Sequence, residues 1–250
     1  MSAPQFKDHF SRLAAQYAAF RPRYPAALFD YLAAVAPART AAWDCACGSG
    51  QATLDLAERF DGVIATDASA QQVAQALPHP HVTYRVAPAE RSGLSPESVD
   101  LVTVAQSLHW FDFDAFYAEV RRVLRNDGVL AVWTYGVQTV DSPQINAAVQ
   151  EFYSETVGEY WPPERRLIED GYRSLPFPFV EMIPPAFAMS ERWTLPQLLG
   201  YFRSWSATSR YVQRNAVDPV TQLGEQIAPL WGEAERVIHW PLSMRLGRKT

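Results

Sequence analysis

The sequence predicts an α/β fold built on a mainly parallel sheet, and three features of the first half of the chain support this. Short apolar segments alternate with amphipathic segments of about ten residues, the order expected of strands joined by helical crossovers. The apolar segments contain few polar residues, as in a sheet that helices cover on both faces. Residues that begin helices or favour turns separate them, such as Ser69 and Asn126-Asp127-Gly128.

The predicted elements of this half follow in chain order. Pro22 and Pro25 end a predicted helix at 12–20, and Pro37 ends a second one at 26–36. The pattern then predicts five strands, at 40–46, 62–67, 82–87, 99–105 and 129–135. Helices are predicted between or beside them at 51–60, 69–77 and 114–125.

The second half differs in composition and is rich in Trp, Tyr, Phe and Pro between Asp141 and Trp231. Helices are predicted at 144–158, 195–205 and 219–230, without parallel strands between them, and a terminal strand at 237–249. There is no repeat and no linker. We therefore expect a single domain over 1–250, with N-terminal lid helices at 6–36, a core at about 38–136 and an aromatic helical cap at about 141–231.

Composition excludes several classes of function. The net charge of −5 argues against nucleic acid or an anionic membrane as a partner, because phosphate groups require a basic face. The sequence has neither a signal-peptide pattern nor an apolar run of about 18 residues. Its two cysteines are too close in sequence to staple a fold. These observations predict a cytoplasmic protein.

The segment DCACGSG, residues 44–50, directly follows the first predicted strand and opens a helix. Glycine lets the backbone approach a ligand closely, and a helix N-terminus offers unpaired N–H groups. Seventeen residues after Gly50, Asp67 ends the second strand, where an acid can accept both hydroxyls of a ribose. The pattern therefore predicts a nucleotide-type ligand.

Other interpretations of DCACGSG fit less well. Nicotinamide and flavin sites favour G-x-G-x-x-G, whereas the spacing here is A-x-G-x-G, and a P-loop needs a lysine that is missing. A zinc site lacks a second ligand pair, and a redox site prefers C-x-x-C. We expect Cys45 and Cys47 to be small residues at a strand end, with no metal.

Taken in order, five segments resemble the motifs of class I S-adenosylmethionine-dependent methyltransferases. They are DCACGSG, ATDAS (65–69), APAE (87–90), VDLVTVAQSLHWFD (99–112) and FYAEVRRVLRNDGVLAVW (116–133). YAAFRPRYP (17–25), the AQSLHWFD strand end and RSWS (203–206) are similar to the small-molecule branch that includes trans-aconitate methyltransferase. The chain departs from the family pattern at Ala46, where a glycine is usual.

The resemblance implies a fold, a cofactor and its binding residues. The fold is a doubly wound, Rossmann-like sheet of seven strands, the last antiparallel and near 237–249. The cofactor is S-adenosylmethionine. Its methionine part is expected to contact Asp44, Cys45, Ala46, Cys47, Gly48, Ser49, Gly50 and Gln106. Asp67 and Ala68 are expected at the ribose, Ala89 and Glu90 at the adenine, and Tyr17 and Arg21 as a lid, with Arg21 on the carboxylate.

Each of these residues also has a plainer interpretation that the sequence leaves open. Asp67 could be a helix cap, Glu90 a solvated acid and Arg21 a surface residue. His109 could pack beneath the cap without chemistry, and the cap aromatics could form a second hydrophobic core.

We expect an enzyme that transfers a methyl group from S-adenosylmethionine to a small molecule, either an organic acid or a similarly compact metabolite. His109 is the candidate general base for a hydroxyl acceptor. The acceptor residues are expected to be His109, Trp110, Arg203, Trp205 and Arg210. The alternatives are a non-catalytic cofactor-binding or partner module on the same fold and, less well supported, a nicotinamide oxidoreductase. Oligomeric state and the acceptor atom stay open.

Overall fold

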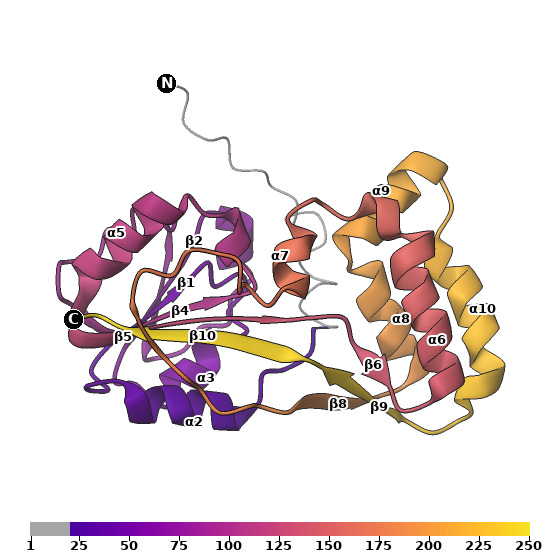
Figure 1. The fold of residues 1–250 in the computed structure, drawn as a ribbon, viewed down its shortest axis with the longest axis horizontal. Helices are drawn as coiled ribbons and strands as arrows, with labels where there is room; N and C mark the ends of the chain where they lie inside the picture. Colours follow the sequence, from indigo (N-terminus) through magenta and orange to yellow (C-terminus); the bar gives the residue numbers. More distant parts are fainter. Residues whose placement is uncertain (1–20) are drawn as a thin grey trace.

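The computed structural model describes residues 21–250, and a seven-stranded sheet forms the larger part of the molecule (Figure 1). The strand order is β3-β2-β1-β4-β5-β10-β7. Five strands are parallel: β1 (Ala42–Cys45), β2 (Val63–Asp67), β3 (Val82–Val86), β4 (Val99–Ala105) and β5 (Leu124–Tyr135). The antiparallel β10 (Leu242–Arg248) lies between β5 and β7 (Val180–Met182). The predicted seven-stranded, mainly parallel sheet is confirmed, whereas its edge strand β7 was not predicted.

Four helices accompany the parallel strands: α2 (Ala26–Val35), α3 (Thr53–Ala57), α4 (Ala70–Val73) and α5 (Phe113–Val123). Ser69 caps α4, as predicted, by accepting a hydrogen bond from the Gln72 backbone N–H at 3.3 Å. The end of α5 differs from the prediction, because the helix stops at Val123 and β5 begins at Leu124. Its backbone turns extended at Leu124 so that this residue pairs with Val99 of β4.

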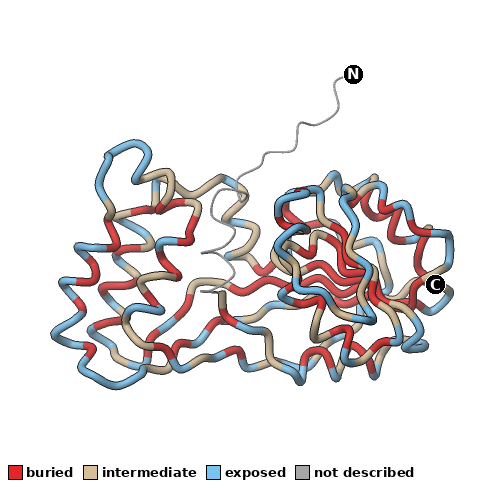
Figure 2. The backbone as a smooth tube through the Cα atoms, turned by 180° about the vertical axis from the view of Figure 1, so that it is seen from behind, coloured by how far each residue is buried: buried red, intermediate tan, exposed pale blue. Residues whose placement is uncertain are grey.

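Two hydrophobic cores cover the two faces of the sheet. On one face α5 packs Phe116 and Val120 against Trp43 of β1, and on the other α2 packs Phe29 near Trp133 of β5. Figure 2 shows these strands as an almost continuously buried block. A sheet buried on both faces explains the nearly all-apolar strands of the sequence.

The cap is a bundle of helices beside the sheet (Figure 1). It contains α6 (Pro143–Glu151), extended by a π-helical turn over Phe152–Thr156, α8 (Leu195–Arg203), α9 (Ser206–Asn215) and α10 (Pro219–Trp231). Its aromatic residues form a core of their own, with Phe152, Phe202 and Trp205 buried against one another. The short helix α7 (Arg165–Glu169) and the 3-10 turn Gly158–Tyr160 were not predicted, and neither was α9.

The terminal segment corrects one prediction. Residues 237–249 form two strands rather than one, because Pro241 lacks the N–H that continuous pairing requires. Before Pro241, β9 (Arg236–Trp240) joins β6 (Thr139–Val140) and β8 (Met189–Trp193) in a three-stranded antiparallel sheet beside the bundle; after it, β10 enters the main sheet. This crossing ties the cap to the core.

Candidate active site

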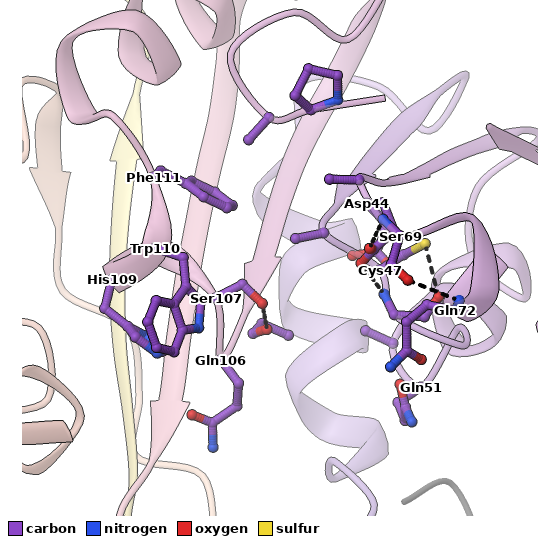
Figure 3. A pocket seen from close by; sticks show the side chains of 18 of the residues that line it. Asp44, Cys47, Gln51, Ser69, Gln72, Gln106, Ser107, His109, Trp110 and Phe111 are labelled. Carbon is purple, nitrogen blue, oxygen red and sulfur yellow. Dashed lines mark hydrogen bonds between the residues drawn. The ribbon is translucent and has the colours of Figure 1, made fainter. Parts of the chain in front are cut away.

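A cavity of about 810 Å³ opens at the carboxyl ends of β1, β2 and β4. Figure 3 shows Asp44, Cys47 and Ser69 on one wall and His109 and Trp110 on the opposite wall. A second cavity of about 70 Å³ lies toward the cap. The two cavities share the lining residues Arg21, Gln106, His109, Trp110 and Tyr135. The carboxyl ends of parallel strands are the usual ligand site of such sheets, and here they lead into a smaller compartment.

The glycine-rich turn after β1 forms one wall. Ala46 and Gly48 both have left-handed backbone conformations, with φ of 55° and 57°. The turn therefore forms with alanine at position 46 in place of the usual glycine. The left-handed conformation costs a residue with a Cβ about 1–2 kcal/mol. Gly50 has φ of 96°, and a Cβ there would lie 2.7 Å from the Tyr84 Oη. Only glycine fits at Gly50 without displacing Tyr84.

Asp67 connects the end of β2 to this turn. Its Oδ2 accepts a hydrogen bond from the Gly48 N–H at 2.9 Å, and its Oδ1 accepts one from the Ser69 N–H at 2.8 Å. The side chain also lines the cavity. Each carboxylate oxygen can accept more than one hydrogen bond, so its part in the turn is compatible with the predicted contact to a ribose, which stays a prediction.

Asp44 lies beneath the turn as a buried carboxyl group. Its oxygens accept hydrogen bonds from the Thr53 Oγ1 at 2.6 Å and the Thr103 Oγ1 at 2.9 Å. Burial raises its pKa to about 6; the two threonine hydrogen bonds oppose this shift and the negative charge of Asp67 adds to it. A ligand cation next to Asp44 would favour its ionised form.

Cys45 and Cys47 are free and buried, and only Cys47 lines the cavity. Burial raises the pKa of both thiols, and the charge of Asp44 raises it further. Within residues 21–250, no three His, Cys, Asp or Glu side chains gather in a way that could hold a metal ion.

The remaining predicted cofactor residues are mostly at the cavity. Ala68, Ala89, Glu90 and Gln106 line it, as does Arg21, whose Nη1 donates to the Tyr135 Oη at 2.7 Å. Ser49 and Gly50 belong to the turn but do not line the cavity, and Tyr17 lies outside the described residues.

Gln106 occupies a strained position at the end of β4. Its φ is 58°, and its side chain is held by two contacts of its own chain. The Oε1 accepts from the Thr134 Oγ1 at 2.5 Å, and the Nε2 donates to the Tyr135 carbonyl at 3.2 Å. A residue held in this unusual conformation between two cavities is typical of a functional site.

His109 belongs to the 3-10 turn Leu108–Trp110 that follows β4. The residue is 8% exposed, and its Nδ1 lies 2.8 Å from the Tyr172 Oη. Burial and, to a lesser extent, the positive charge of Arg165 lower its pKa to about 3. His109 is therefore neutral at physiological pH.

The predicted acceptor residues divide into two groups. His109, Trp110 and Trp205 line the smaller cavity. Arg203 and Arg210 line neither cavity: the Arg203 Nε pairs with Asp218 at 2.8 Å, and the Arg210 Nη1 donates to the Tyr160 carbonyl at 3.2 Å.

Sequence reasoning missed Arg165, which lines the smaller cavity. It placed Tyr201 and Tyr172 only among the aromatic residues of the cap, whereas Tyr201 lines the smaller cavity and Tyr172 is the partner of His109. The cue for Arg165 was WPPERR (161–166), which places Trp, Pro and Arg together in the cap sequence.

The sheet order, the glycine-rich turn and the acid after β2 define a Rossmann-like, nucleotide-cofactor enzyme class. A family model described as a methyltransferase domain matches residues 43–132. A Dictyostelium discoideum protein named as a methyltransferase is 32% identical over 98% of this chain and 96% of its own length. The methyltransferase cfoB of Aspergillus candidus is 28% identical over 78% of this chain and 68% of its own.

Among solved structures, a protein of Anaeromyxobacter dehalogenans described as a type II methyltransferase is 49% identical, with a TM-score of 0.86. The match covers 92% of this chain and 98% of that one. The chain belongs to the class I S-adenosylmethionine-dependent methyltransferases, and its cofactor is S-adenosylmethionine. Its place in the trans-aconitate branch stays a prediction. No helix in the described part of the chain is long and apolar enough to cross a bilayer.

Proposed function

We propose that this methyltransferase acts on a small molecule, and that its acceptor is a compact organic acid. The observation that carries the proposal is the pair of adjoining cavities. The larger, at about 810 Å³, is in the size range of small-molecule sites, and the smaller, at about 70 Å³, has room for only a few atoms. The cofactor would occupy the larger cavity, and the acceptor would enter the smaller one.

The residues of the larger cavity fit the cofactor. Asp67 would accept the ribose hydroxyls, and the turn from Asp44 to Gly50 would hold the methionine part. Arg21 would meet the cofactor carboxylate. Glu90, with Ala68 and Ala89, would border the ribose and adenine. When bound, the cofactor would supply a methyl group attached to a sulfonium sulfur, and the electron pair of the sulfur–carbon bond would remain on sulfur after transfer.

The protein's own contribution would be alignment and exclusion of water. Gln106 and His109 line both cavities, so they would position an acceptor atom between the acceptor compartment and the cofactor. His109 is held by Tyr172 and is neutral, which lets it donate or accept a hydrogen bond without adding charge.

The low pKa of His109 favours a carboxylic acid over an alcohol as the methyl acceptor. A general base works best when its pKa lies near the operating pH, and His109, at about 3, is far below it. A carboxylate acceptor is already ionised and needs no base. The chemistry expected of the site is therefore methyl ester formation, in which a carboxylate oxygen bonds to the methyl carbon and no proton is released.

The test is an unbiased one. The protein is incubated with methyl-labelled S-adenosylmethionine and a metabolite mixture, and products are searched by mass for one added methyl group. A labelled small acid is the expected result. Label only in protein or nucleic acid would contradict the proposal. Cofactor binding without any methylated product would instead favour the non-catalytic module.

A further inference from the structure

The smaller cavity has the charge of an anion site. Two of its lining residues, Arg21 and Arg165, carry guanidinium groups, and none of the described residues that line it carries a carboxylate. The other walls are mainly aromatic side chains, with one amide, Gln106. Aromatic walls exclude water, and a cation in a water-poor site binds an anion more strongly than one at the surface.

Arg165 is held in place by contacts that leave part of its donor fork free. Its Nε donates to the Tyr153 Oη at 2.7 Å and also lies 3.9 Å from the Oε1 of Glu169, a half-exposed carboxylate to which Tyr153 bonds as well. The guanidinium carbon lies 4.5 Å from the centre of the Trp161 ring. The side chain is 18% exposed, and neither Nη atom forms a hydrogen bond with any residue from 21 to 250. An arginine fork of this kind suits bidentate binding of a carboxylate.

The position of Arg165 separates it from the methyl-transfer point. Arg165 lines only the smaller cavity, whereas Gly48 and Asp67 line only the larger one. His109 and Gln106 line both. A group bound to Arg165 would therefore lie on the cap side of His109 and Gln106, away from the larger cavity.

We propose that Arg165 anchors an anionic group of the acceptor that is distinct from the atom that is methylated. This inference rests on the proposed function and makes it specific: the preferred acceptors carry two polar groups, one anchored and one reacting. In the reaction the nucleophilic oxygen forms a bond to the methyl carbon while the carbon–sulfur bond breaks, and the anchored group is unchanged. Arg165 takes the role that the sequence suggested for Arg203 and Arg210.

The test compares acids with their half-amides. Succinate and glutarate offer an anchor and a nucleophile, whereas their monoamides keep the reacting carboxylate and lose the anionic anchor. Arg165→Met removes the fork, and Arg165→Lys keeps the charge without the planar geometry. Arg166→Met is the matched control, because Arg166 is the next residue of α7, is exposed and lines neither cavity.

In the wild type the diacids should be methylated with the higher kcat/KM. Arg165→Met should lower kcat/KM for the diacids by roughly 10- to 100-fold, mainly through KM, since a charge-assisted bidentate contact is lost. The same variant should change the monoamide kinetics less than about threefold, and the cofactor Kd should stay the same. For the diacids, the kcat/KM of Arg165→Lys should lie between those of the wild type and Arg165→Met. The kcat/KM of Arg166→Met should match that of the wild type.

Equal losses on diacids and monoamides would show a structural role and overturn the inference. So would a wild type that prefers the monoamides, although small-molecule methyl transfer would then stand. If no small molecule is methylated, the proposed function fails. Calorimetric titration of glutarate into the S-adenosylhomocysteine complex then decides the anion site: binding that Arg165→Met abolishes supports it, and absence of binding overturns it.

Discussion

Replacement of Asp67 tests the central feature of the cofactor site. Hydrogen bonds to a charged group contribute about 1.5–3 kcal/mol, so Asp67→Ala should weaken S-adenosylmethionine and S-adenosylhomocysteine binding by roughly 10- to 150-fold. The structure adds a second effect. Because the carboxylate also accepts from the Gly48 and Ser69 N–H groups, the variant should lose at least about 1.5 kcal/mol of free energy of unfolding even without cofactor.

Calorimetry with a ribose-modified ligand separates these effects. In the wild type, removing the 3′-hydroxyl of S-adenosylhomocysteine should weaken binding, whereas in Asp67→Ala the same removal should cost little, since the acceptor is gone. Asp61→Ala, an exposed carboxylate outside the cavity, is the control. Unchanged affinity in Asp67→Ala, or an equal penalty for the missing hydroxyl in both proteins, would refute the assignment of Asp67 to the ribose.

Three further predictions follow from the buried groups of the site. The raised pKa of Asp44, about 6 against 3.8, means that the folded protein holds this proton more tightly. The stability that protonated Asp44 contributes is therefore lost as pH rises from about 4 through 6. The cationic cofactor should bind more tightly over the same rise in pH, because Asp44 becomes ionised. Calorimetry at pH 5 and pH 7 should show this gain in cofactor affinity in the wild type and not in Asp44→Asn. His109→Ala should lower the rate with a carboxylate acceptor by less than about tenfold, against roughly 10²–10⁴-fold for a hydroxyl acceptor that needs a base, and a large loss with a carboxylate would contradict the proposed chemistry. Cys45 and Cys47, whose thiols are buried, should react with iodoacetamide at pH 8 only after unfolding, and metal analysis should find no stoichiometric zinc; about one zinc per chain would make DCACGSG a metal site.

Local patterns in the sequence were enough to predict the core. Strand and helix periodicity placed all five parallel strands, and Ser69 caps its helix as the sequence indicated. The glycine-rich turn and Asp67 were predicted at the ends of neighbouring strands, and they meet through the Gly48–Asp67 hydrogen bond. These features were predictable because a buried parallel strand, a turn and a cap each depend on a few adjacent residues, and parallel strands bring their carboxyl ends to one edge.

The acceptor side depended on contacts between segments far apart in the chain. Arg203 and Arg165 are both arginines in aromatic surroundings, and only the fold shows that Arg203 pairs with Asp218 while Arg165 lines the smaller cavity. The contact between His109 and Tyr172 spans 63 residues, and burial rather than residue type lowers the pKa of His109. Composition and periodicity by themselves determined the class of fold and the cofactor turn. The tertiary structure decided which charged side chains line the smaller cavity, because burial and the pairing of distant side chains exist only after the chain has packed.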